Sequence, residues 1–97
     1  MAAKYKIRSE VIPYPGMAAW FFAHVDKKQS EIIRTKHHVK KRGFGSIKVK
    51  ATIGKTTWST SIFPDKRSGT YVLPLKSSVR KAEGIARGDR INLTLTI

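Results

Sequence analysis

The stretch IKVKATIGKTTWSTSIF, residues 47–63, contains two runs in which apolar and polar side chains alternate. Every second side chain is apolar from Ile47 to Ile53, and residues 57–63 alternate again around Trp58, Thr60 and Ile62. Alternation of this kind is typical of strands with one buried and one solvent-facing side. Gly54 and Lys55 supply a turn between the runs, so the stretch predicts a β-hairpin and a fold based on β-sheet.

Four segments outside this hairpin also have strand character. Residues 5–11 and 90–97 alternate apolar and polar side chains, so each strand is expected to bury one face. Residues 18–25, AAWFFAHV, are almost continuously apolar, which predicts a central strand buried on both sides. Residues 70–73 form a short strand that Pro74 ends.

A first short helix is expected within residues 26–42, where the alternation stops and helix-forming residues become frequent. Asp26 or Ser30 can serve as its N-cap, because both side chains accept hydrogen bonds from free backbone N–H groups. Ile32 and Ile33 are its only strong apolar residues, so the helix is predicted to dock through these two side chains.

A second, brief helix is expected to run to Glu83, with Ser77 or Ser78 as its N-cap and Gly84 ending it in a left-handed turn. The predicted order is therefore β-β-α-β-β-β-α-β in one domain, residues 1–97. Short strands with helices too short to form a layer indicate a mainly β fold. We predict a small closed or partly closed β-barrel, because closure removes exposed strand edges.

The composition suggests the class of partner. Twenty Lys and Arg against six Asp and Glu give a formal net charge of +14, which is the electrostatic footprint of a protein that binds nucleic acid or another polyanion. The chain has no cysteine, which excludes disulfides and cysteine-ligated zinc. The start, MAAKYKIR, lacks the apolar core of a signal peptide, and residues 17–25 are too short to cross a membrane. We expect a cytoplasmic protein without membrane contact.

Several sequence words together carry a resemblance to a known family. They are GFGSIKV from Gly43, TIGKTTWSTSIFP (52–64), YVLPLK (71–76), VRKAEGI (79–85) and GDRI (88–91), joined by Pro15-Gly16 and the Trp20-Phe21-Phe22 strand. In these words the chain resembles the bacterial DUF1905 family, a domain of unknown function. The resemblance implies a barrel of the double-split type, similar to that of bacterial transition-state regulators and antitoxins. It implies no activity.

A basic patch is the first candidate site. If the first helix folds over the edge of the hairpin, cations from both elements form one surface that contacts phosphates, with one aromatic ring to stack on a base. The residues of this predicted patch are Arg34, Lys36, Lys40, Lys41, Arg42, Phe44, Lys48 and Lys50. The alternative is that these charges form only a solvated face.

A second candidate is an anion pocket made by Arg80, Thr60 and Ser61. The alternatives are that Arg80 pairs with Asp89 or Glu83 and that the two hydroxyls satisfy backbone groups. Three further groups of residues have structural explanations. Trp58 is expected in the core, Gly88-Asp89 in a tight turn, and the consecutive His37 and His38 diverge on a helix rather than converge on a metal.

No catalytic constellation is visible, since the six carboxylates are scattered and no phosphate-binding loop occurs. We therefore expect a protein that is not an enzyme and has no cofactor and no metal site. The leading hypothesis is a barrel that binds an anionic partner, nucleic acid above all. The alternative is a module that binds a protein partner or a small ligand, in which the charge is incidental. The oligomeric state is left open.

Overall fold

The fold is that of a computed structural model, which describes residues 3–14, 17–37 and 45–97. Over these residues the chain forms six strands and two helices in the order predicted from the sequence. The elements are β1 (Lys4–Tyr14), β2 (Met17–His24), α1 (Lys27–Lys36), β3 (Ile47–Ile53), β4 (Thr56–Asp65), β5 (Thr70–Pro74), α2 (Ser77–Glu83) and β6 (Arg90–Thr96).

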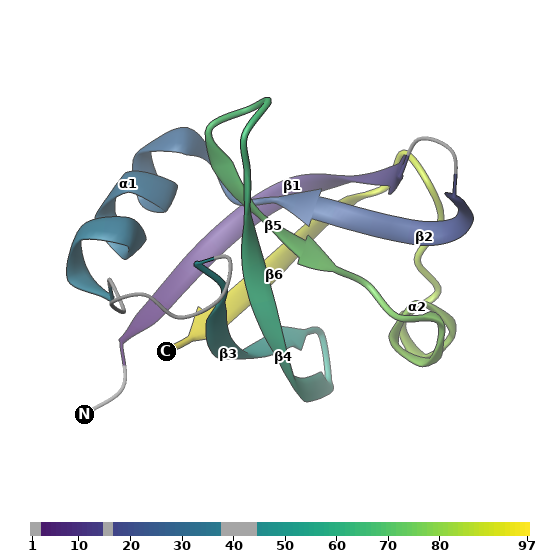
Figure 1. Cartoon of the computed structure of the whole chain (residues 1–97). Helices are drawn as coiled ribbons and strands as arrows, with labels where there is room; N and C mark the ends of the chain where they lie inside the picture. Colours follow the sequence, from purple (N-terminus) through teal and green to yellow (C-terminus); the bar gives the residue numbers. More distant parts are fainter. Residues whose placement is uncertain (1–2, 15–16, 38–44) are drawn as a thin grey trace.

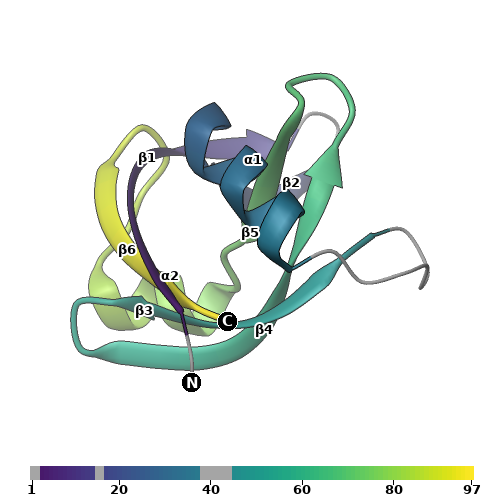
Figure 2. The same cartoon turned by 90° about the vertical axis from the view of Figure 1, so that its left-hand side faces the viewer.

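The strands close into an antiparallel barrel in the order β1-β2-β5-β4-β3-β6, which confirms the predicted barrel (Figures 1 and 2). The long strands β1 and β4 belong to both halves of the barrel. The start of β1 pairs with β6 and its end with β2, while β4 pairs with β3 up to Ile62 and with β5 from Phe63 onward. The closed ladder leaves no edge exposed among the described strands.

The inward side chains of the strands fill the barrel. In β3 the four apolar residues are buried while Lys48 and Lys50 between them are exposed, as the alternation predicts. Leu73 of β5 and Leu95 of β6 are completely buried, and Trp58 packs partly buried against the same core. Each such apolar side chain contributes about 1.5–3 kcal/mol to the hydrophobic driving force.

Helices α1 and α2 lie on opposite sides of the barrel (Figures 1 and 2). Asp26 is the N-cap of α1, and its carboxylate accepts the backbone N–H of Gln29 at 3.0 Å. The helix docks through Ile33, which is fully buried. Ile32 is 39% exposed, so the prediction of a second anchor is wrong. At a helical spacing of about 100 degrees, two consecutive residues do not share one narrow buried stripe.

Ser30, the other N-cap candidate, has a different role. It lies inside α1 and is fully buried, so it does not cap the helix. Its hydroxyl donates to the carbonyl of Val25 at 3.1 Å and accepts the backbone N–H of Tyr71 at 3.0 Å. Ser30 therefore fastens α1 to β5 and satisfies two backbone groups that the barrel would otherwise bury unpaired.

Helix α2 starts one residue earlier than expected. The backbone enters the helix at Lys76, which has no side-chain cap, so both candidate serines lie in the first turn and the predicted serine cap is wrong. Gly84 ends the helix in the left-handed conformation, as predicted. Val79 is buried against the barrel, and the Glu83 carboxylate accepts the Thr56 hydroxyl at 2.5 Å. These contacts hold α2 against the turn between β3 and β4.

The prediction that β2 is buried on both sides is also wrong. Ala23 is buried and Phe21 packs against the core, but Trp20 on the opposite side of the strand is 50% exposed. The outer side of β2 has no second layer over it and instead lines an open groove. An apolar run does not distinguish these two environments, because both favour the same residue types.

Candidate functional site: a basic face and an aromatic groove

Basic side chains gather on the outer surface of the half-barrel that contains β1, β6 and β3. Lys4, Lys6 and Arg8 are exposed at every second position of β1, and Lys48 and Lys50 occupy the same kind of position on β3. The residues between these positions point to the opposite face of each strand and therefore into the barrel interior. We term these five residues the basic face.

Strand β6 joins the two rows of cations. Thr96 pairs in register with Lys4 on one side and with Lys50 on the other. Two strand spacings, about 10 Å, therefore separate the Cα atoms of these two lysines. The next outward residues of β6, Thr94 and Asn92, are also uncharged. At this spacing, both lysines can contact phosphates of one bound polyanion.

The structure describes only some residues of the basic patch that the sequence predicts around α1. The two lysines of β3 belong to the basic face. Arg34 points elsewhere: its Nη2 donates to the carbonyl of Gly69 at 3.2 Å, and its guanidinium lies 5.7 Å from the ring of Tyr71. Lys36 is exposed near the end of α1. The other members of that patch lie outside the described residues: Lys40, Lys41, Arg42 and Phe44.

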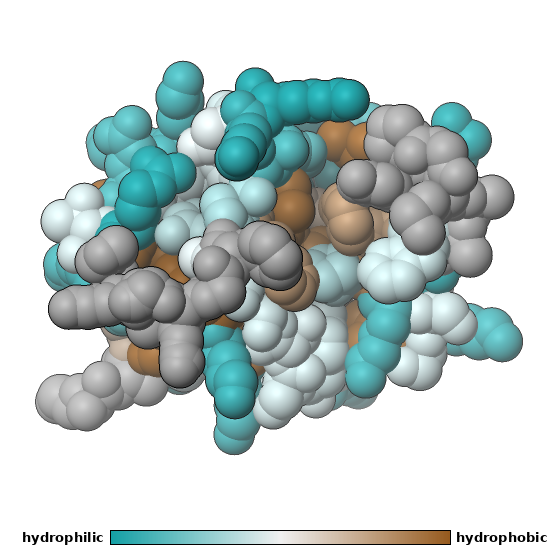
Figure 3. All heavy atoms as spheres, in the orientation of Figure 1, coloured by the Kyte–Doolittle hydropathy of each residue, from teal (hydrophilic) through white to brown (hydrophobic). Residues whose placement is uncertain are grey.

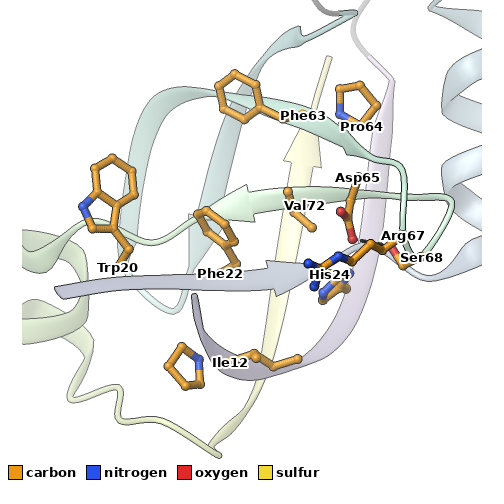
Figure 4. A pocket seen from close by; sticks show the side chains of 11 residues that line it. Ile12, Trp20, Phe22, His24, Phe63, Pro64, Asp65, Arg67, Ser68 and Val72 are labelled. Atoms are coloured by element: carbon orange, nitrogen blue, oxygen red, sulfur yellow. Dashed lines mark hydrogen bonds between the residues drawn. The ribbon is translucent and has the colours of Figure 1, made fainter. Parts of the chain in front are cut away.

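An open groove of about 750 Å³ runs over the outer side of the other half-barrel. Trp20, Phe22 and His24 follow one another along β2, and Phe63 lies across from them on β4 (Figure 4). Hydrophobic side chains reach the surface in the middle of this face (Figure 3). We term it the aromatic groove. Its apolar lining is Ile12, Pro13, Trp20, Phe22, Phe63, Pro64 and Val72, and its polar end is His24, Asp65, Arg67 and Ser68.

The groove exists because the strand in its middle carries small outward side chains. Val72 of β5 pairs in register with His24 of β2 on one side and with Phe63 of β4 on the other. The rings of His24 and Phe63 therefore form the two walls of the groove, and Val72 forms its floor. Trp20 remains 50% exposed and Phe63 41% exposed, and the Trp20 ring meets Phe22 edge to face at 6.5 Å between centroids.

A chain of hydrogen bonds crosses the polar end. The Ser68 hydroxyl donates to the Asp65 carboxylate at 2.8 Å, so its single proton is used there. Thr70 lies 2.7 Å from Ser68 and must donate to it, which leaves the Thr70 oxygen to accept from Nδ1 of His24 at 3.0 Å. Neutral His24 therefore carries its proton on Nδ1, and Nε2 is left as an acceptor.

Asp65 is the anionic end of this chain. Its pKa lies below the ordinary value, mainly because Ser68 donates a hydrogen bond to the carboxylate, with help from backbone N–H groups of Arg67 and Ser68. The carboxylate therefore stays ionised at neutral pH and fixes the direction of every hydrogen bond from Asp65 to His24.

The family of the protein is identified by a match over almost the whole chain. Residues 8–95 match a family described as "Domain of unknown function (DUF1905)". This chain belongs to the DUF1905 family. The matched span runs from β1 into β6, so it includes the whole aromatic groove and both lysines of β3. No curated protein sequence matches the chain.

The DUF1905 chain has a smaller cavity, of about 280 Å³, at the α2 end of the barrel. It brings Arg80 and Thr60 of the predicted anion pocket together, beside Lys76, but Ser61 does not line it. Arg80 donates through Nε to the carbonyl of Leu75 at 3.0 Å, and its guanidinium stacks 4.3 Å from the ring of Phe21. Arg80 therefore helps to hold α2 against β2, which gives it a structural role in this cavity.

The acidic residues near α2 have their own partners. Glu83 holds the β3–β4 turn, and the Asp89 carboxylate accepts the backbone N–H of Ala86 at 2.8 Å in the turn from Ala86 to Asp89, which contains Gly88. The turn predicted at Gly88-Asp89 is thus confirmed, with Gly88 at a positive φ of 86°.

The remaining histidine in the described chain also has a partner. Nε2 of His37 lies 2.9 Å from the Tyr5 hydroxyl, and His38 is outside the described residues. Within residues 3–14, 17–37 and 45–97, no three His, Asp or Glu side chains lie together in a way that could hold a metal ion. No helix in that part of the chain is long and apolar enough to cross a membrane.

Sequence reasoning missed the groove and three of the five residues of the basic face. The alternation that placed Ile7 inward also placed Lys6 and Arg8 outward, so a signal for the β1 cations was present. Only the strand register shows that they lie two strands from Lys50. For the groove, the useful signal was the run Trp20-Phe21-Phe22, whose neighbouring rings must point to opposite sides of a strand.

Proposed function

We propose that this DUF1905 protein is a non-enzymatic binding module that holds nucleic acid by its phosphates through the basic face. The observation that supports the proposal is the register of β1, β6 and β3, which places five cations on one surface with only neutral polar side chains on the strand between them. Glu10, the next outward residue of β1, pairs in register with Arg90. A net charge of +14 adds long-range attraction.

The chemistry of this face favours phosphates over base edges. Lysine is a point charge on a flexible stem, and four of the five cations are lysines. If all five contact phosphates, log affinity for duplex falls with log salt at a slope of about −4. Affinity should differ little between base sequences, because phosphate contacts carry no sequence information.

The absence of enzymatic activity is part of the proposal. Four of the six carboxylates make hydrogen bonds that organise a helix end or a turn: Asp26, Asp65, Glu83 and Asp89. Carboxylates held in this way are poorly placed to serve as an acid and base pair on a substrate. Binding is therefore the function that the described side chains support best.

Fluorescence anisotropy with labelled single-stranded and duplex DNA and RNA tests the proposal, from low to physiological salt and with heparin as competitor. The variant is Lys48→Glu with Lys50→Glu. Its control is Lys81→Glu with Arg87→Glu, which makes the same charge change at exposed residues of α2 and the following loop. The β3 variant should lose more than tenfold in affinity and reduce the salt slope by about 2. Equal losses in both variants would rule out the basic face.

A second candidate function is a module that binds a protein segment or a small apolar ligand. The observation that favours it is the aromatic groove, whose volume of about 750 Å³ lies in the range of ligand sites. The two candidates differ in salt dependence. Binding in an apolar groove should change little between low and physiological salt, whereas binding to the basic face should weaken steeply.

A further inference from the structure

Two aromatic rings are exposed on the outer surface of the half-barrel that contains β2, β5 and β4. Trp20 is 50% exposed and Phe63 is 41% exposed, and they stand on opposite walls of the aromatic groove. Exposed aromatic rings that share one concave surface usually mark a binding site, because together they offer a ligand a continuous apolar contact area. Exposed rings scattered singly over a surface do not. Both rings offer flat faces of the kind on which bases of single-stranded nucleic acid stack.

The groove also contains a hydrogen-bond acceptor of fixed direction. The chain from Asp65 through Ser68 and Thr70 holds the proton of neutral His24 on Nδ1. Its Nε2 has no hydrogen-bond partner among the described residues and belongs to a ring that lines the groove. A ligand with an N–H or O–H donor at the edge of a flat ring would satisfy it.

Two cations lie near the groove, one at its polar end and one on the strand next to β4. Arg67 belongs to its polar end. Lys48, on the neighbouring strand β3, pairs in register with Ser61, which lies two residues before Phe63 on β4. Lys48 and Phe63 are thus diagonal neighbours on one surface, with Cα atoms about 7–8 Å apart. The basic face and the aromatic groove therefore adjoin at Lys48 and Phe63, while the carboxylate of Asp65 lies at the polar end of the groove beside Arg67.

We propose that the aromatic groove receives an unpaired base of the bound nucleic acid, so that the protein prefers single strands to duplexes. This inference rests on the proposed function. A nucleotide supplies a flat ring for Trp20 or Phe63, an N–H donor on its Watson–Crick edge for His24, and phosphates for Arg67 and Lys48. In a duplex the same donors are used in pairing and the ring faces are stacked, so only an unpaired base fits.

An apolar protein segment accounts for fewer of these features. It would use the rings, but it would make no use of the positive charge of Lys48 beside the groove. A strand of nucleic acid matches the positive charge of the protein along its whole length. The charge complementarity therefore favours the nucleic acid as the occupant.

The test compares two single strands of equal length and charge. One carries thymine bases and the other carries abasic sugar residues, so both offer the same phosphates to the basic face. The wild-type protein should bind the thymine strand about tenfold more tightly, since stacking of one base contributes about that factor. Trp20→Ala and Phe63→Ala should each remove most of this preference and leave binding of the abasic strand unchanged.

Ile32→Ala is the matched control, because Ile32 is as exposed as Phe63 but lies on α1. It should leave both affinities unchanged. Trp20→Phe retains a ring and should keep most of the preference, which guards against a variant that merely unfolds. Methylation of thymine at N3 removes the donor for His24 while keeping ring and charge, so it should weaken binding about fivefold.

The outcomes separate the two proposals. Equal affinity for the thymine and abasic strands would overturn the groove inference and leave the basic face in place. Unchanged nucleic-acid binding by Trp20→Ala and Phe63→Ala would do the same and would point to a protein segment in the groove. No binding of either strand at low salt would overturn the proposed function, and the groove inference with it.

Discussion

The basic face and the aromatic groove are both formed by outward side chains of barrel strands, but these side chains are cationic on one surface and aromatic on the other. On the basic face, outward positions of β1 and β3 carry cations that water solvates well. On the aromatic groove, outward positions of β2 and β4 carry rings that water solvates poorly. Inward positions on both sides fill one continuous core. The comparison shows that the inward side chains of the strands specify the fold. The outward side chains can differ in chemistry without changing the fold, so they can serve binding.

The largest expected effect is a difference in stability between alanine variants of two neighbouring residues of β2. Phe21 packs against the core beneath Arg80, so Phe21→Ala should lower the free energy of unfolding by about 2–3 kcal/mol. Trp20→Ala should lower it by less than about 1 kcal/mol, because its ring faces the groove. Urea denaturation of both variants measures the difference. Equal losses would mean that Trp20 is a structural residue and would remove the contrast between the two sides of the strand.

The sequence predicts the inner side of this fold much better than the outer one. Alternation identified the strands, and it placed Ile47 to Ile53 and residues 90–97 with the correct side inward. It was ambiguous for β2, since Trp20 and Phe22 would look the same in a second buried layer. The difference depends on what covers the strand, and this is decided by the rest of the fold rather than by local residues.

Residues that act across the chain were the hardest to predict. Ser30 had the residue type of an N-cap, but its partner Tyr71 is 41 residues away, so only the folded chain shows its role. In the same way, Lys4 and Lys50 join one surface only because Thr96 pairs with both. Sequence reasoning found the cations of β3 and looked for further cations in the adjacent helix, whereas the other cations of the basic face come from β1, on the far side of β6.

A smaller effect is expected at the polar end of the groove. The pKa of Asp65 is lowered in the folded state, so the ionised carboxylate stabilises the fold above its ordinary value of 3.8. This contribution is lost as the pH falls through the lowered pKa. Asp65→Asn should therefore lower the thermal midpoint at pH 7, with a change in unfolding free energy of about 1 kcal/mol or less after solvent screening.

The same variant sharpens the contrast between the two surfaces. The difference in thermal midpoint between Asp65→Asn and the wild type should narrow as the pH falls through the lowered pKa of Asp65, because the wild-type carboxyl group then becomes uncharged like the asparagine. The variant should also reduce the preference for base-bearing strands, because Ser68 and Thr70 lose the anion that orients them toward His24. Duplex binding should not change. A loss of duplex affinity as large as the loss for single strands would contradict the separation of groove and basic face.

The smallest expected effect has the opposite sign and concerns the basic face. Replacing Lys48 and Lys50 with glutamine removes two charges from a surface where cations lie about 10 Å apart, so mutual repulsion in the folded state decreases. At low salt the variant should be more stable than the wild type by a few tenths of a kcal/mol, and at high salt the gain should disappear. Lys81→Gln with Arg87→Gln, away from this face, should gain less.

Thermal unfolding of the three proteins over a range of salt concentrations measures this effect. A destabilised β3 variant would show that the lysine stems cover apolar surface and contribute to packing. The expected gain has a further consequence for the basic face. Lys48 and Lys50 would then oppose folding slightly, as is expected of residues that serve binding at some cost in stability.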